Sequence, residues 1–146
     1  MKQKISDVMT RDVSFAWPHM TIREAALQMK ERGIGSLPVC EGRQVIGMLT
    51  DRDLAIRATA EGADPHLTKV ADIMTREVVS CTPEDYLETA EQLMHDLQLR
   101  RLPVVDDDGE LVGFLSLAKV ARNETAEQAG RVIKGVSQPS APLPMG

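Results

Sequence analysis

The 146-residue sequence has little cysteine, few aromatic residues and no long run of either apolar or basic residues. Its two cysteines are too few for the disulfide framework of a small secreted domain. Aromatic residues make up 3% of the chain, so the core has to be built from aliphatic side chains and the eight methionines. No apolar stretch approaches the roughly 18 residues of a membrane span, and the polar N-terminus lacks a signal-peptide pattern. We therefore expect a cytoplasmic protein with no membrane partner.

The charge balance argues against a nucleic-acid partner. The net charge is −5 and the isoelectric point is about 5.2, whereas binding a polyanion normally requires a basic face. The longest basic run is the pair Arg100-Arg101. A small anionic ligand is still compatible with this composition, because one local pair of arginines can outweigh a weak overall field. Apolar residues at 42% and charged residues at 27% are typical of a globular domain.

The chain repeats itself. DVMTRDV at 7–13 returns 65 residues later as DIMTREV at 72–78, and LPV at 37–39 returns at 102–104. One extra residue enters the turn at 106–109, so that GMLT at 47–50 corresponds to GFLS at 113–116 with an offset of 66. The shared order of these blocks indicates a duplication. A pair of units of this size predicts two half-domains that bury their apolar faces against each other.

The pattern within each repeat predicts the order strand, helix, strand, strand, helix. Thr21 and Glu24 form a capping-box pattern at the start of a helix that Gly33 ends. In the second repeat we expect Thr82 to cap the corresponding helix and Pro83 to lie in its first turn. The other expected elements are a brief strand at 13–15, two hairpins whose turns are at 41–43 and 106–109, and helices at 51–60 and 117–122.

These elements give the domain boundaries. We expect repeat 1 at 5–58, a connector at 59–71, repeat 2 at 72–123, a C-terminal helix at 124–136 and a disordered tail at 137–146.

The segment 47–53 joins a strand end, a glycine and a helix start. Thr50 is a candidate N-cap, and Asp53 lies in the same first turn, where its carboxylate could accept hydrogen bonds from the two hydroxyls of a ribose. Thr-x-x-Asp is equally an ordinary capping arrangement. In the duplicate the hydroxyl is kept as Ser116, but Lys119 replaces the carboxylate. The second helix starts without an Asp there, which suggests a second task for Asp53.

Arg100 and Arg101 come directly before a buried strand. Guanidinium groups match the geometry of phosphate oxygens, so the pair is a candidate phosphate site. Two alternatives are a solvated strand end and a salt bridge to the acidic turn at 106–108.

Catalytic and metal-binding patterns are missing from the sequence. His19, His66 and His95 fall on unrelated elements, and no two of the histidines and cysteines have the spacing of metal ligands. No Cys-x-x-Cys, His-Glu-x-x-His or Gly-x-Ser-x-Gly motif occurs. We expect neither an enzyme nor a metal site.

The blocks DVMTRDV, GIGSLPVC and GMLTDRDL, followed by DIMTREVV, LRRLPVVDDDG and GFLSLAKV, resemble the two halves of a CBS-domain pair, the Bateman module. In size the chain is similar to small stand-alone bacterial CBS-pair proteins, including hypoxic-response proteins. The resemblance implies an α/β fold (α+β by some schemes) of tandem CBS repeats. Each repeat would be β-α-β-β-α, packed through the sheets, and the chain would form a homodimer.

The resemblance also implies a ligand and its contacts. Family members bind adenosyl compounds such as AMP, ADP, ATP or S-adenosylmethionine, with NADH as a further option, in clefts between the repeats. Carried over, Asp53 would bind ribose and Thr50 phosphate, while Arg100 and Arg101 would reach across from the other repeat. The base would lie near Val78, Val79, Leu99 and Pro103.

The resemblance predicts a non-catalytic regulatory module with one nucleotide per chain, read by an effector protein. The second cleft, with Ser116 and Lys119, departs from the pattern and is expected to be empty or weak. The alternative is a ligand-free adapter that acts by protein–protein interaction.

Overall fold

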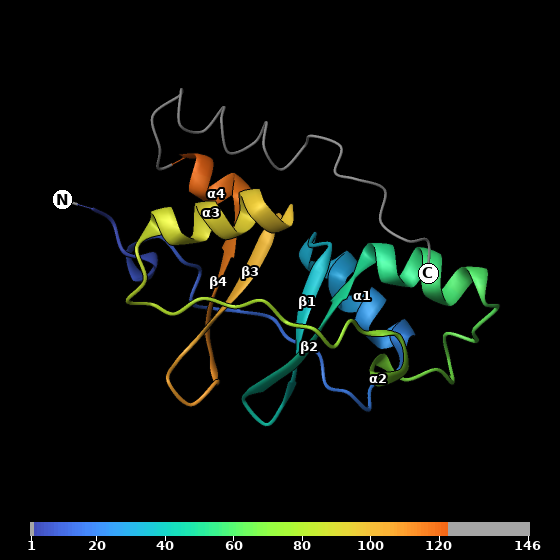
Figure 1. The fold of residues 1–146 in the computed structure, drawn as a ribbon. Helices are drawn as coiled ribbons and strands as arrows, with labels where there is room; N and C mark the ends of the chain where they lie inside the picture. The colour runs from blue at the N-terminus through green and yellow to red at the C-terminus, as the bar shows by residue number, and fades with distance from the viewer. Residues whose placement is uncertain (1, 123–146) are drawn as a thin grey trace. The chain divides into compact units, whose positions relative to one another are not determined.

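The computed structural model describes residues 2–122. The C-terminal helix expected at 124–136 and the tail expected at 137–146 lie outside the described residues. The described chain contains both helices and strands, and its strands form two small antiparallel sheets, which confirms the predicted mixed fold class. The four strands and the four α-helices are labelled in Figure 1.

The first repeat contains the helix α1 (Ile22–Arg32), the hairpin β1 (Ser36–Glu41) and β2 (Gln44–Thr50), and the helix η2 (Asp53–Ala58). The second repeat contains α2 (Val70–Ile73), α3 (Leu87–Leu97), the hairpin β3 (Arg101–Val105) and β4 (Leu111–Ser116), and α4 (Leu117–Arg122). A short 3-10 helix, η1 (Ile5–Asp7), precedes them.

The chain folds into two compact units that do not follow the repeats strictly. The first-repeat unit consists of Asp12–Val79 together with Val105–Leu111. The second-repeat unit consists, within the described residues, of 2–11, Ser80–Val104 and 112–122. The opening motif of each repeat therefore belongs to the unit that holds the other repeat. Thr10 of the first motif bridges Phe114, and Thr75 of the second bridges Met48.

Two glycines permit this exchange of opening motifs. A Cβ atom at Gly47 would lie 2.6 Å from the Met74 sulfur and 3.0 Å from the Thr75 carbonyl oxygen. At Gly113 it would lie 2.5 Å from the Met9 sulfur. A side chain at either position would therefore push the opening motif away from the hairpin that it pairs with.

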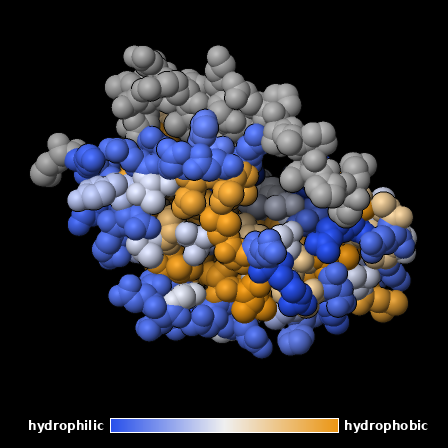
Figure 2. Space-filling model, in the orientation of Figure 1, coloured by the Kyte–Doolittle hydropathy of each residue, from blue (hydrophilic) through white to orange (hydrophobic). Residues whose placement is uncertain are grey.

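The core consists of aliphatic and methionine side chains, as the composition predicts. In the first-repeat unit it joins α1, the hairpin and α2, and Leu37, Val39, Leu49 and Val70 are fully buried. Leu102, Leu115 and Met94 are fully buried in the second-repeat unit. Some hydrophobic residues reach the surface among hydrophilic ones, as Figure 2 shows for one face. The exposed large side chains are Trp17, Leu27, Ile34, Ile56, Leu67, Tyr86 and Leu97.

The first helix of repeat 1 has the predicted ends. The Thr21 hydroxyl accepts a hydrogen bond from the Glu24 amide at 3.2 Å, and Gly33 ends α1 in the left-handed conformation with φ 64°. Both hairpins are also where the pattern predicts them. The helix expected at 51–60 is present as well, but its central part, η2, is a π-helix.

Two expected elements are wrong. No strand forms at 13–15, and Ala16 makes only a single parallel bridge to Val39. The helix expected to start at Thr82 begins at Leu87 instead. Residues 82–85 form a turn, in which the Asp85 carboxylate accepts the Thr82 amide at 2.9 Å. The Leu87 amide donates to Gln3. Contacts with the N-terminal segment therefore compete with extension of the helix toward Pro83.

Candidate functional site

Thr50 and Asp53 hold each other at the junction of β2 and η2. The Thr50 amide donates to Asp53 Oδ2 at 3.0 Å, and the Asp53 amide donates to Thr50 Oγ1 at 3.0 Å. This reciprocal pair is the capping arrangement that the sequence left as an alternative. Both residues are half-buried. A carboxylate has about four acceptor sites, so the capping bond leaves Asp53 with acceptor capacity for a ligand hydroxyl.

Thr75 extends this pair into a cluster of three polar residues. Its amide and carbonyl both bond to Met48 of β2, at 2.8 and 2.9 Å. Its hydroxyl donates to Asp53 Oδ1 at 3.5 Å, a weak hydrogen bond. Thr75 is exposed, so the second oxygen of the Asp53 carboxylate faces a group that water or a ligand can replace. Sequence reasoning did not assign Thr75 to the site, although it belongs to the most clearly repeated motif of the chain.

A cavity of about 490 Å³ begins beside this cluster, within the first-repeat unit. Two arginines belong to its lining. Arg57 Nη1 donates to the Met74 carbonyl at 3.3 Å, and Arg76 Nη2 donates to the Ala71 carbonyl at 3.1 Å. The complete lining is Arg57, Ala71, Asp72, Met74, Thr75, Arg76 and Glu77. Sequence reasoning also missed Arg57 and Arg76, because neither lies at a position with a characteristic ligand spacing.

The remaining predicted site residues are divided between the units. Val78 and Val79 are half-buried and follow the cavity residues in the first-repeat unit. The other four belong to the second-repeat unit, where Leu99 is half-buried, Arg100 and Arg101 are exposed and Pro103 is fully buried. The Arg100 carbonyl accepts the Leu117 amide at 2.7 Å.

The counterpart of the cluster in the second-repeat unit has the opposite charge. Ser116 Oγ accepts the Lys119 amide at 3.2 Å, which repeats the capping bond of Thr50. The Lys119 ammonium lies 3.2 Å from Thr10 Oγ1, in the position where Asp53 approaches Thr75. This unit therefore keeps the two hydroxyl groups and replaces the carboxylate with a cation.

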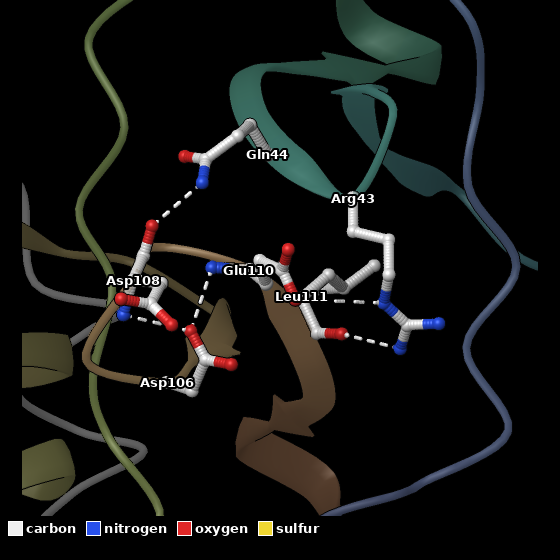
Figure 3. Close-up of polar contacts among 6 residues, drawn as sticks. All are labelled: Arg43, Gln44, Asp106, Asp108, Glu110 and Leu111. Atoms are coloured by element: carbon white, nitrogen blue, oxygen red, sulfur yellow. Dashed lines mark hydrogen bonds and ion pairs between the residues drawn. The ribbon is translucent and has the colours of Figure 1, made fainter.

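The tip of the first hairpin binds the acidic turn, a contact that the sequence did not reveal. Gln44 Nε2 donates to the Asp108 carbonyl at 2.6 Å, and Arg43 Nη2 donates to the Leu111 carbonyl at 3.3 Å (Figure 3). Arg43 Nε also lies 4.0 Å from a Glu110 carboxylate oxygen. Asp106 caps its own turn, because its Oδ1 accepts the amides of Asp108 and Glu110 at 2.9 Å each.

The cysteines are unsuited to reaction. Burial raises the pKa of the Cys40 thiol to about 11. Burial, helped by the Asp85 carboxylate, raises the pKa of the Cys81 thiol to about 12. Within residues 2–122 no group of three or more histidine, cysteine, aspartate or glutamate side chains could hold a metal ion. No helix of the described chain is long and apolar enough to cross a membrane.

The chain has clear relatives among known proteins. The CBS domain model matches residues 5–58 and 70–126. The CBS domain-containing protein YhcV of Bacillus subtilis is 44% identical over 134 residues, which cover 91% of this chain and 94% of YhcV. The crystal structure of Hypoxic Response Protein I with two coordinated zinc ions has a TM-score of 0.77 and 31% identity, covering 84% of this chain and 99% of that one.

A further similar structure was determined with a nucleotide bound. It is CBSX2 in complex with AMP, with a TM-score of 0.73 and 25% identity, and the match covers 82% of this chain and 94% of CBSX2. The two matches to the CBS model, the internal duplication and the two small sheets all lead to one conclusion. The chain belongs to the CBS-domain family and carries a tandem pair of CBS domains.

Proposed function

We propose that this CBS pair is a non-catalytic regulatory module that binds an adenine nucleotide or a related adenosyl compound. The observation that carries the proposal is the polar cluster of Thr50, Asp53 and Thr75, of which Thr75 also lines a cavity of about 490 Å³. A cavity of this size with a few convergent polar groups is typical of a small-molecule site. The AMP bound by CBSX2, a protein of the same fold, supports an adenosyl ligand.

In this proposal Asp53 accepts hydrogen bonds from the ribose hydroxyls. Its Oδ1 atom exchanges the long 3.5 Å contact with Thr75 for a shorter bond to the ligand, while Oδ2 keeps the cap with Thr50. Within residues 2–122 the Thr50 hydroxyl accepts the Asp53 amide and donates to no group, so its own donor is available for a phosphate. Arg100 and Arg101 stay predicted phosphate ligands, and Val78, Val79, Leu99 and Pro103 stay predicted neighbours of the base.

The nucleotide would regulate by population shift. A ligand changes a conformational equilibrium only by the difference between its affinities for the two states. A ligand anchored on the η2 cap and on the motif at 74–77 favours the state in which these two segments are held together. An effector protein that binds this state would then respond to the nucleotide concentration.

A homodimer is likewise a prediction, and sedimentation velocity of the purified protein tests it.

A ligand-free adapter is the second candidate. It is favoured by the finding that the Asp53 carboxylate already accepts the Thr50 amide at the start of the helix at 51–60, so that the carboxylate has a structural task without any nucleotide. In an adapter the cluster would serve folding alone, and the chain would act through its surface.

Thermal melting separates the two candidates. The purified protein is melted with and without AMP, ADP, ATP, S-adenosylmethionine and NADH, beside Asp53→Asn and the control Asp51→Asn. A ligand at 100 times its dissociation constant adds about 2.7 kcal/mol, which corresponds to a shift of several degrees. We expect a shift in the wild type and in Asp51→Asn, and a much smaller one in Asp53→Asn. If no ligand shifts the wild type, the adapter is the better account.

A further inference from the structure

The cavity at 71–77 contains two guanidinium groups whose orientation is set by the main chain. Arg57 is held by the Met74 carbonyl and Arg76 by the Ala71 carbonyl. Within residues 2–122 neither arginine forms an ion pair with a carboxylate, in contrast to Arg43, whose Nε lies 4.0 Å from Glu110. A guanidinium has five N–H donors, so these carbonyl bonds leave most of the donors of each arginine for another acceptor.

Thr75 connects the cavity to the predicted ribose site. Thr75 lines the cavity, and its hydroxyl reaches Asp53 Oδ1. Arg57 follows Asp53 by four residues on η2, which places both on one short helix. A nucleoside held by Asp53 would therefore have both arginines within reach of a flexible charged substituent.

We propose that this cavity receives the distal phosphates of the nucleotide, so that the module binds di- and triphosphates more tightly than the monophosphate. The inference rests on the proposed function. Guanidinium forks match phosphate oxygens and form charge-assisted hydrogen bonds, which are stronger than neutral ones. Arg57 and Arg76 are thus residues that determine specificity, in addition to the groups that recognise the nucleoside.

The acidic groups of the cavity limit what it binds. Asp72 and Glu77 belong to the same lining, so its formal charge is balanced by the two arginines. A free anion would meet repulsion from both carboxylates. Phosphates gain from the arginines only when the nucleoside is anchored at Asp53, which raises their effective concentration beside the guanidinium groups. Inorganic triphosphate alone is therefore expected to bind far more weakly than ATP.

Isothermal titration calorimetry with AMP, ADP and ATP tests the proposal on the full chain. The double variant Arg57→Gln/Arg76→Gln removes both guanidinium groups. Arg23→Gln/Arg52→Gln is the matched control, because these exposed arginines of the same unit do not line the cavity. We expect the wild type and the control to bind ATP about tenfold more tightly than AMP. The cavity variant should lose about tenfold for ATP and bind AMP as the wild type does.

The outcomes separate this proposal from the proposed function. Equal affinities for AMP and ATP in the wild type, or an equal loss of both in the cavity variant, would overturn the role of the arginines and leave nucleotide binding intact. Absence of binding by any adenosyl ligand to a protein that melts cooperatively would remove both. If the double variant does not fold, the single Arg57→Lys and Arg76→Lys variants replace it. Each keeps the charge without the fork, and each should lose part of the preference for ATP without losing AMP.

Discussion

The two units of this chain share one helix-capping arrangement, but the charged side chain in it is a carboxylate in the first-repeat unit and an ammonium in the second. In the first-repeat unit the Thr50 hydroxyl caps a helix by accepting the Asp53 amide, and the carboxylate of Asp53, the third residue after Thr50, accepts the Thr50 amide. In the second-repeat unit Ser116 accepts the amide of Lys119 in the same way, but the side chain at the third position is a cation. The capping hydroxyl is therefore common to both units, whereas the carboxylate is not required to start a helix there.

The opening motifs extend the comparison. Thr75 offers its hydroxyl to the Asp53 carboxylate, and Thr10 lies beside the Lys119 ammonium at 3.2 Å. A carboxylate in this position accepts hydrogen bonds from a diol, and an ammonium cannot accept any. Both units thus keep the capping hydroxyl and the threonine of the opening motif, but only the first-repeat unit has a carboxylate, the group that suits a ribose. Four predictions test how far the two units differ.

The largest expected effect comes from the matched core positions Leu49 and Leu115, both with 0% exposure. Replacing either by alanine should lower the free energy of unfolding by about 2–5 kcal/mol through lost burial and the remaining cavity. Each unit contains a segment of the other repeat, so we expect the whole described chain to unfold together. Urea denaturation followed by fluorescence of Trp17, the chain's single tryptophan, and by circular dichroism should give coincident transitions for both variants. Two separate transitions would contradict this.

Exchanging the charges should have the next largest effect. Asp53→Lys removes the acceptor proposed for both ribose hydroxyls and introduces a cation beside Thr75. Hydrogen bonds to charged groups contribute about 1.5–3 kcal/mol, so nucleotide affinity should fall at least about a hundredfold. Lys119→Asp is the counterpart, and it should not weaken nucleotide binding, because it leaves the cluster of Thr50, Asp53 and Thr75 unchanged. Calorimetric titration of both variants checks this, and similar losses in the two would refute the assignment of the site to Asp53.

The glycines of the two hairpins should respond alike. Gly47→Ala and Gly113→Ala each place a Cβ atom against a methionine sulfur and close to a threonine carbonyl, at 3.0 Å in the first unit and 3.2 Å in the second. The sulfur can move, but the carbonyl is part of a bridge to the hairpin. Overpacking of this kind costs about 1–3 kcal/mol. Chemical denaturation should show a slightly larger loss for Gly47→Ala, and an unchanged stability in either variant would mean that the opening motif shifts freely.

The sequence was a good guide to elements whose signals are local. The cap at Thr21, the end of α1 at Gly33 and both hairpins follow from patterns that a few neighbouring residues determine. The start of α3 was predicted wrongly because Thr82 and Pro83 form a good helix start on their own. A contact from Gln3, 84 residues before Leu87, decides the boundary instead.

The candidate site shows the same limit. Thr50 and Asp53 were found because they lie three residues apart and have a counterpart in the duplicate. Arg57 and Arg76 join the cavity through a bend of the chain and through bonds to main-chain carbonyls, which no spacing rule describes. The contact of Gln44 with the turn at 106–110 was missed for the same reason, since the two segments are more than 60 residues apart. The sequence therefore predicts capping contacts between near neighbours, but it does not predict contacts between segments that are far apart in the chain.

The smallest expected effect concerns the caps themselves, and it separates their structural task from their ligand task. Thr50→Ala and Ser116→Ala each remove one N-cap acceptor, at 3.0 and 3.2 Å from the amide. Loss of such a cap costs about 1 kcal/mol. We expect similar losses of stability in chemical denaturation but a loss of nucleotide affinity for Thr50→Ala alone, because only Thr50 stands beside a carboxylate that can hold a ribose. Thr50→Ser is the control, since it keeps the hydroxyl and should retain both properties. If Ser116→Ala weakened nucleotide binding as much as Thr50→Ala did, the charge at the third position would not decide which unit binds.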